Sequence, residues 1–225
     1  SASKVSREWR LTTLTSRLSC VRQLLAKIAN VDIVDELADD LNTTLASARS
    51  QLLAIEKRLK KPQVLPGPTG ESNTLHLEPR GTLVTFADKE VTFEYWVLSI
   101  VTGLATGNVV ISVVSDLFYD EALAFKDKFE SSGAPKGVFQ VAKLKHLEAL
   151  LEHADIAGMI IDSNTSRTAN IVQKMAARSG AILPVITAEY NDNMIQRLLT
   201  EKTISIDTTA SGGNTSLMTL VDDDD

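Results

Sequence analysis

The sequence has 225 residues, of which 44% are hydrophobic and 23% charged, and its mean hydropathy is +0.01. These values are typical of a globular protein with a substantial core, and they exclude a chain that is disordered throughout. The formal charge is −6, but four acidic residues lie in the run 222–225, so the rest of the chain is close to neutral.

Neither a membrane span nor a signal peptide is expected, because no apolar run approaches roughly 18 residues. Cys20 is the only cysteine, which excludes an internal disulfide and makes the reducing cytoplasm the expected compartment. The chain begins at Ser1 rather than Met, which suggests a processed chain or a piece of a longer protein. One basic cluster, residues 57–61, lies at an expected helix end, where the helix dipole favours cations, so we expect no nucleic-acid partner.

Residues 1–61 are predicted to form a helical hairpin, since residues 5–60 contain no Gly or Pro and apolar residues recur at helical spacing. Asp32 can cap the start of the second helix, which places the turn near Asn30. No polar residues converge on either apolar face, which favours a packing or oligomerising element. The first face comprises Leu11, Leu14, Leu18, Val21, Leu25 and Ile28, and the second comprises Val34, Leu37, Leu41, Leu45, Ala48, Leu52, Ile55 and Leu59.

A boundary is expected at Lys61-Pro62, because proline cannot continue a helix. Residues 62–79 are predicted to be a turn-rich linker, since the stretch 65–73 has no periodicity and many turn residues.

Residues 80–209 are predicted to form a Rossmann-like α/β domain. Five short apolar runs alternate with five helical stretches, and strands that are apolar throughout belong to a parallel sheet covered by helices on both faces. The expected strands are 82–87, 109–114, 138–142, 156–161 and 182–187, and the expected helices are 90–105, 117–131, 143–153, 164–179 and 191–201. A further strand at 203–209 is followed by a glycine break and by the β-prone residues 215–221, so residues 210–225 are treated as a separate C-terminal segment.

Few residues that could carry chemistry follow the expected strands, where parallel sheets bind ligands. No GxGxxG or GxxxxGK[ST] motif, Ser-His-Asp arrangement, CxxC or HExxH occurs, so no catalytic, cofactor-binding or metal-binding residue is predicted. Asp88, Asp116 and Asp162 each follow a strand, as in a phosphoacceptor site, but a paired acid and a lysine are missing. His146 and His153 are seven residues apart, whereas helical metal pairs prefer a spacing of four, so solvated histidines are the favoured interpretation.

Residues 80–163 resemble the cofactor-binding half of aldehyde dehydrogenases. The similarity lies in Pro79-Arg80-Gly81-Thr82-Leu83-Val84, Thr106-Gly107-Asn108-Val109-Val110-Ile111 and Gly137-Val138-Phe139-Gln140-Val141. Two departures stand out. The family lysine that contacts the adenosine ribose falls on Val113, and the family turn whose backbone lies close to NAD falls on Ile160-Ile161-Asp162-Ser163, where an aspartate would face the pyrophosphate with like charge. The catalytic cysteine has no counterpart, since Cys20 lies outside this region.

The stretches 65–73 and 204–218 resemble the C-terminal region of long proline utilization A proteins, so the resemblance covers roughly residues 62–221. In that family an FAD-dependent proline dehydrogenase makes pyrroline-5-carboxylate, and an NAD-dependent dehydrogenase oxidises the hydrolysed semialdehyde to glutamate. The resemblance implies that this chain is neither catalytic domain. It implies instead the noncatalytic aldehyde-dehydrogenase-like domain, which binds no cofactor itself while the parent chain binds FAD and NAD.

The resemblance also implies partners. The domain would pack on the aldehyde dehydrogenase domain of the same parent chain, and its terminal motif would cover the tunnel that carries the intermediate. A homo-oligomer of the parent, and peripheral attachment of the parent at the inner membrane, remain open. The expected contact residues of this lid are Gly212, Gly213, Asn214, Leu217, Met218 and Leu220.

Two alternatives belong to other functional classes. One is a residual NAD-binding or nucleotide-binding regulatory module, which tight NAD binding would support. The other is a self-contained protein that oligomerises through the helical hairpin.

Overall fold

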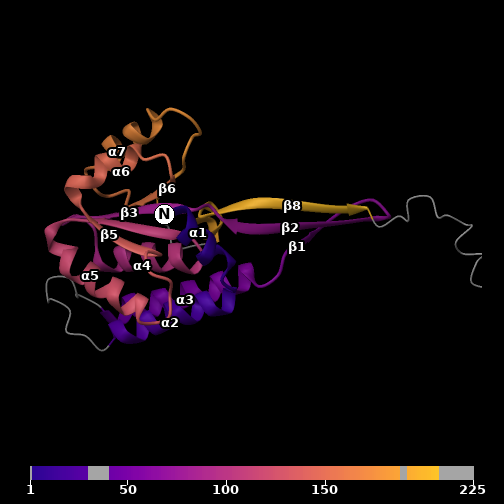
Figure 1. Cartoon of the computed structure of the whole chain (residues 1–225), viewed down its shortest axis with the longest axis horizontal. Helices are drawn as coiled ribbons and strands as arrows, with labels where there is room; N and C mark the ends of the chain where they lie inside the picture. The colour runs from indigo at the N-terminus through magenta and orange to yellow at the C-terminus, as the bar shows by residue number, and fades with distance from the viewer. Residues whose placement is uncertain (1, 30–40, 188–191, 208–225) are drawn as a thin grey trace, which may run out of the picture. The chain divides into compact units, whose positions relative to one another are not determined.

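The computed structural model describes residues 2–29, 41–187 and 192–207 (Figure 1). The chain divides into two compact units. The larger unit comprises Ser1–Lys60 and Glu78–Thr200, and the smaller unit comprises Lys61–Leu77 and Glu201–Asp225. The helical region expected at 1–61 therefore clusters with the α/β residues instead of forming a unit of its own.

A five-stranded parallel sheet forms the centre of the larger unit, as the alternation of apolar runs and helices predicted. Its order is β5-β4-β3-β6-β7. The expected bounds coincide with those of β3 (Thr82–Ala87), β4 (Val109–Val114) and β6 (Ile156–Ile161), while β5 (Phe139–Lys143) is shifted by one residue. β7 is only Val185–Thr187 and not 182–187. Pro184 has no N–H to donate to the sheet, and Ile182 is 98% exposed.

Helices cover both faces of this sheet (Figure 1). α4 (Phe93–Ala105) and α5 (Asp116–Glu130) lie on one face, and α6 (Leu147–Glu152), preceded by the 3-10 turn η1 (Leu144–His146), lies with α7 (Thr168–Ala176) on the other. α4 is buried on nearly every side because it lies between the sheet and α3 (Leu41–Leu59). Trp96 fixes its position: its ring stacks on Phe125 at 4.9 Å between centroids, and its Nε1 donates to Ser112 Oγ at 2.9 Å.

The first helix of the predicted hairpin is divided into two helices in the structure. α1 (Ala2–Leu11) ends before Thr13, whose side chain accepts from the amide of Ser16 and caps α2 (Leu14–Ile28). Because the helix axis is interrupted there, Leu11 leaves the predicted apolar face and is 72% exposed, whereas Cys20 in α2 is buried. Arg17 Nη1 donates to the carbonyl of Thr12 at 2.6 Å, and burial lowers the pKa of its guanidinium.

Trp9 packs α1 against the α/β part of the larger unit. Its side chain is fully buried, its Nε1 donates to the carbonyl of Leu104 in α4 at 3.1 Å, and its ring meets Phe129 of α5 edge-on at 5.8 Å. The helical region thus shares its core with the α/β residues.

The end of α4 and its connection to β4, residues 103–108, pack closely against neighbouring segments. Gly107 has a positive φ of 91°, which a glycine adopts readily. A Cβ on Gly103 would lie 2.7 Å from Val110 Cγ2, so this glycine allows α4 to approach the sheet. Asn108 Oδ1 accepts from the amide of Gly81 at 3.0 Å, and its Nδ2 donates to Thr106 Oγ1 and the Leu198 carbonyl.

The smaller unit contains strands where the sequence predicted a linker. β1 (Gln63–Leu65) and β2 (Glu71–Pro79) pair antiparallel, with Gln63 opposite Leu75 and Leu65 opposite Asn73. The turn residues occupy only 66–70, which leaves enough chain on each side for a hairpin. β8 (Leu199–Asp207) completes the order β1-β2-β8 and begins four residues before the predicted 203.

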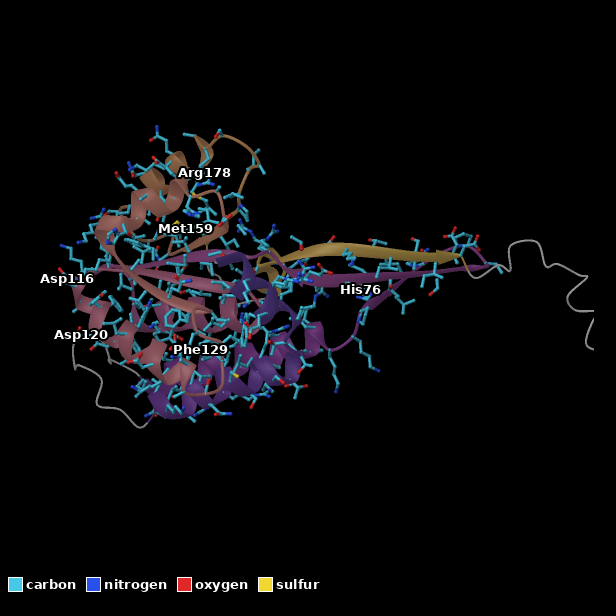
Figure 2. The ribbon with its side chains drawn as sticks, in the orientation of Figure 1. His76, Asp116, Asp120, Phe129, Met159 and Arg178 are labelled. Carbon is cyan, nitrogen blue, oxygen red and sulfur yellow. The ribbon has the colours of Figure 1, made fainter. Side chains whose placement is uncertain are left out.

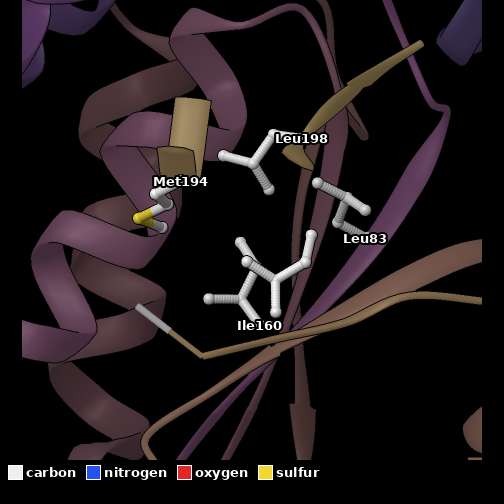
Figure 3. Close-up of a cluster of buried hydrophobic side chains, with 5 residues drawn as sticks. Leu83, Ile160, Met194 and Leu198 are labelled. Atoms are coloured by element: carbon white, nitrogen blue, oxygen red, sulfur yellow. The ribbon is translucent and has the colours of Figure 1, made fainter. Parts of the chain in front are cut away.

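A cluster of buried side chains closes the β7 side of the sheet (Figure 3). It joins β3, β6 and β7 to α8 (Asp192–Arg197) and the residue after it, through Leu83, Ile160, Ile186, Met194 and Leu198. Among the described helices, none combines the length and the apolar character that crossing a bilayer requires.

Candidate functional site

The sheet reverses its winding between β3 and β6, which is where open parallel sheets bind ligands at the carboxyl ends of their strands. At that edge, Asp88 and Glu90 follow β3, and Asp162 begins the turn that leads into α7. Asp88 and Asp162 are each 7% exposed. The edge therefore presents carboxylates, which accept hydrogen bonds, at a place where an anionic ligand would need donors.

The turn before α7 has no spare amide donor among five consecutive residues. The amide of Asn164 donates to Asp162 Oδ1 at 2.8 Å, and that of Ser166 donates to Glu90 Oε2 at 2.6 Å. The other three bonds run from Thr165 N to Asp162 O, from Arg167 N to Thr165 Oγ1, and from Thr168 N to Thr165 O. Acceptors of this chain thus occupy the amides that lead into α7, close to where a phosphate at a helix start would seek donors.

Glu90 reaches this turn from a segment 76 residues away in sequence. Its carboxylate also accepts from the hydroxyl of Thr165 at 3.2 Å. The backbone bond from Ser166 is the main cause that lowers the pKa of Glu90, so this carboxylate stays ionised at neutral pH. Glu90 therefore places a negative charge directly on the amides before α7.

Asp88 is held by two contacts. Its Oδ1 accepts from the amide of Glu90 at 3.0 Å, and its Oδ2 lies 3.3 Å from Arg167 Nε. The one cation of the turn is thereby paired with a buried carboxylate, and the β3–α4 loop is bound to the turn before α7.

The remaining residues singled out in the sequence do not assemble into a second site. Asp116 is exposed and forms a 3.4 Å ion pair with Lys143, whose Nζ also lies over the Tyr119 ring. His146 ends η1, whereas His153 follows α6 and its Nδ1 accepts from the amide of Asp155. Across the described ranges, no three His, Cys, Asp or Glu side chains are grouped to hold a metal ion.

The predicted lid residues lie beyond the described part of the chain, which ends at Asp207 in β8. They are Gly212, Gly213, Asn214, Leu217, Met218 and Leu220.

Sequence reasoning missed the part that Glu90 plays, although it noted that Asp88 follows a strand. Its partner Ser166 follows another strand, and no local pattern signals that pairing. The only available signal was the excess of acidic residues after the two central strands.

The model of the aldehyde dehydrogenase family matches residues 1–190. The chain belongs to this family. Because the match starts at residue 1, it includes the N-terminal helices.

Its relatives include much longer proteins. Bifunctional protein PutA of Salmonella typhimurium is 30% identical over 160 residues, which are 70% of this chain and 11% of that protein, and PutA of Escherichia coli gives the same values. Succinate-semialdehyde dehydrogenase [NADP(+)] of Deinococcus radiodurans is 24% identical over 193 residues, or 79% of this chain and 40% of that enzyme. The chain thus spans about a tenth of the PutA proteins that it matches.

Solved structures show the same fold. Proline utilization A of Bradyrhizobium japonicum superposes with a TM-score of 0.74 at 23% identity, covering 83% of this chain and 21% of that one. A structure of PnpE in complex with nicotinamide adenine dinucleotide gives 0.67 at 19% identity, covering 78% and 39%.

The family implies a nicotinamide cofactor, and the residues at the switch point do not fit one. The amides of residues 164–168, which lead into α7, are already bonded, and Asp162 and Glu90 would face a pyrophosphate with like charge. Val113, which the resemblance places at the ribose contact, is fully buried in β4 and has no group that could bond a hydroxyl.

Proposed function

We propose that this chain is a noncatalytic aldehyde-dehydrogenase-family domain at the C-terminal end of a longer proline-catabolic enzyme. The observation that carries the proposal is the Glu90–Ser166 contact, in which a carboxylate of the chain takes the amide that a cofactor phosphate would need. Such a domain keeps the family fold, while its own Glu90 carboxylate takes the place of a cofactor phosphate. Its role would then depend on the contacts that its surface makes with other domains.

The identity of the parent rests on the relatives. Those with 30% identity are named bifunctional protein PutA, and this chain spans 11% of them. In our proposal the rest of the parent carries an FAD-dependent proline dehydrogenase and an NAD-dependent glutamate-semialdehyde dehydrogenase. This chain binds neither cofactor, and the parent works in the cytoplasm, with peripheral attachment at the inner membrane as a further proposal.

Packing on the dehydrogenase domain is the proposed role, and the smaller unit supports it. β8 lies at an edge of the order β1-β2-β8 and is nine residues long. Val64 on β1 and Ile206 on β8 are 79% and 56% exposed. The long edge formed by β8, with Ile206 exposed, favours pairing with another sheet, and the partner proposed here is the dehydrogenase domain.

The same unit leads into the proposed lid. Two residues separate Asp207, the last described residue of β8, from the segment 210–225. We assign Gly212, Gly213, Asn214, Leu217, Met218 and Leu220 as contacts that cover the tunnel for the intermediate. Deleting residues 210–225 from the parent should lengthen the lag between proline oxidation and NADH formation, whereas deleting only residues 222–225 should not. An unchanged lag in the larger deletion would contradict the lid.

Complementation tests the packing role. The parent is shortened so that it ends before this chain, its NAD-dependent semialdehyde oxidation is measured, and this chain is then added as a separate protein. We expect activity to fall on truncation and to recover on addition. Binding without recovery would contradict the proposal and favour a regulatory or purely oligomeric domain.

A further inference from the structure

A hollow of about 200 Å³ lies between α6 and the end of α7, among residues that none of the preceding proposals uses. Pockets that hold drug-sized ligands measure about 300–1,000 Å³, so this one suits a smaller molecule. Figure 2 labels Arg178, which lies on the α6 and α7 side of the sheet. The lining residues are Glu148, Leu151, Glu152, Lys174, Ala177 and Arg178.

Arg178, which lines this hollow, has unused hydrogen-bond donors. Its Nη2 donates to the carbonyl of His153 at 3.1 Å. Its Nε and Nη1 are buried and have no hydrogen-bond partner. Buried donors without a partner are costly, and charged ones more so, which favours a ligand that accepts from them. A carboxylate is the group whose two oxygens match the guanidinium fork.

The other charges in the hollow restrict what such a ligand can be. Lys174 donates to Glu148, and this contact lowers the pKa of Glu148, so these two charges compensate each other. Glu152 forms no ion pair within the described residues. An unpaired carboxylate in the same hollow as Arg178 repels a dianion such as phosphate and attracts an ammonium group.

Leu151 and Ala177 complete the lining with apolar surface. We propose that the hollow binds a zwitterionic amino acid with a short aliphatic side chain. The ligand carboxylate accepts from Arg178, its ammonium donates to Glu152, and its side chain contacts Leu151 and Ala177. Because Nε and Nη1 are buried, the Arg178 side chain changes rotamer to present them to the ligand, which requires no backbone movement.

Titration of the whole 225-residue chain with L-valine, followed by amide NMR shifts, tests the proposal. Isovalerate lacks the ammonium group, and isobutylamine lacks the carboxylate. We expect saturable shifts confined to residues 147–153 and 174–178 with L-valine, and clearly weaker binding of both analogues. No saturable shift with L-valine, or equal binding of isovalerate, would overturn the proposal.

Two variants assign the contacts. Arg178→Gln should weaken L-valine binding about tenfold or more, because a charge-assisted contact is lost. Glu152→Gln should remove the preference for L-valine over isovalerate. Arg49 is an exposed arginine on α3, so Arg49→Gln is the matched control and should bind L-valine like the unsubstituted 225-residue chain. If Arg178→Gln does not fold, Arg178→Lys takes its place, and undiminished binding by the folded variant would contradict the assignment.

Discussion

Trp9 offers a quantitative test of whether the N-terminal helices belong to the core of the larger unit. The ring is fully buried, bonds the Leu104 carbonyl and packs on Phe129. Replacing a buried Trp by Ala costs about 3–5 kcal/mol, because transfer free energy is lost and a cavity remains. Trp9→Phe keeps most of the apolar volume and loses one hydrogen bond, so it should cost about 1 kcal/mol from that bond.

The assay follows from the composition. The sequence has two tryptophans, so Trp9→Ala leaves Trp96, in α4 beside the sheet, as the only indole fluorophore. Urea unfolding is followed by Trp96 fluorescence and by far-UV circular dichroism. We expect both midpoints to fall together, while Leu11→Ala, at a site 72% exposed, changes stability by no more than about 0.5 kcal/mol. A Trp96 transition that does not move in Trp9→Ala would refute the shared core and restore an independent hairpin.

Three further substitutions test the packing and the site. Gly103→Ala should destabilise the fold by about 1–3 kcal/mol in thermal unfolding, because its Cβ would lie 2.7 Å from Val110 Cγ2; stabilisation, as at an ordinary helical glycine, would show that the contact is wrong. Asn108→Ala leaves the buried partners of Asn108 on three segments without their hydrogen bonds, so it should cost about 1–3 kcal/mol or more. An unchanged free energy of unfolding in urea would count against this network. Glu90→Gln tests the bond to Ser166. The pKa of Glu90 is lowered in the folded state, so its contribution is present above the unfolded-state pKa and is lost as pH falls through the folded one. The difference in melting temperature between the unsubstituted chain and Glu90→Gln should shrink from about pH 7 to about pH 3. A difference that stays constant over this range would contradict the bond from Ser166 to an ionised Glu90.

The fold could be predicted from the sequence where burial alone sets the pattern. The runs at 82–87, 109–114 and 156–161 are apolar throughout because both faces of the sheet are covered, and their bounds coincide with β3, β4 and β6. The division of the first helix was missed, because the spacing of apolar residues continues through Thr12-Thr13, although the bond from the Ser16 amide to Thr13 starts a new helix there. The strands at 63–65 and 71–79 were missed for a similar reason, since turn residues dominate the composition between them.

The site was predictable only in part. Val113 and Asp162 stood out as departures from a family pattern, and the structure places one in the core and the other at the switch point. The contact of Glu90 with Ser166 joins segments from two different strands, so it depends on the sheet order and not on any local motif. The free nitrogens of Arg178 likewise depend on how α6 packs beside α7.

Isothermal titration of this chain with NAD tests the central claim most directly. The bonded amides before α7, the carboxylates of Glu90 and Asp162 and the buried Val113 predict no saturable heat. Tight binding with a stoichiometry of one would contradict a noncatalytic domain that fills its own phosphate site, and it would identify the chain as a nucleotide-binding regulatory module.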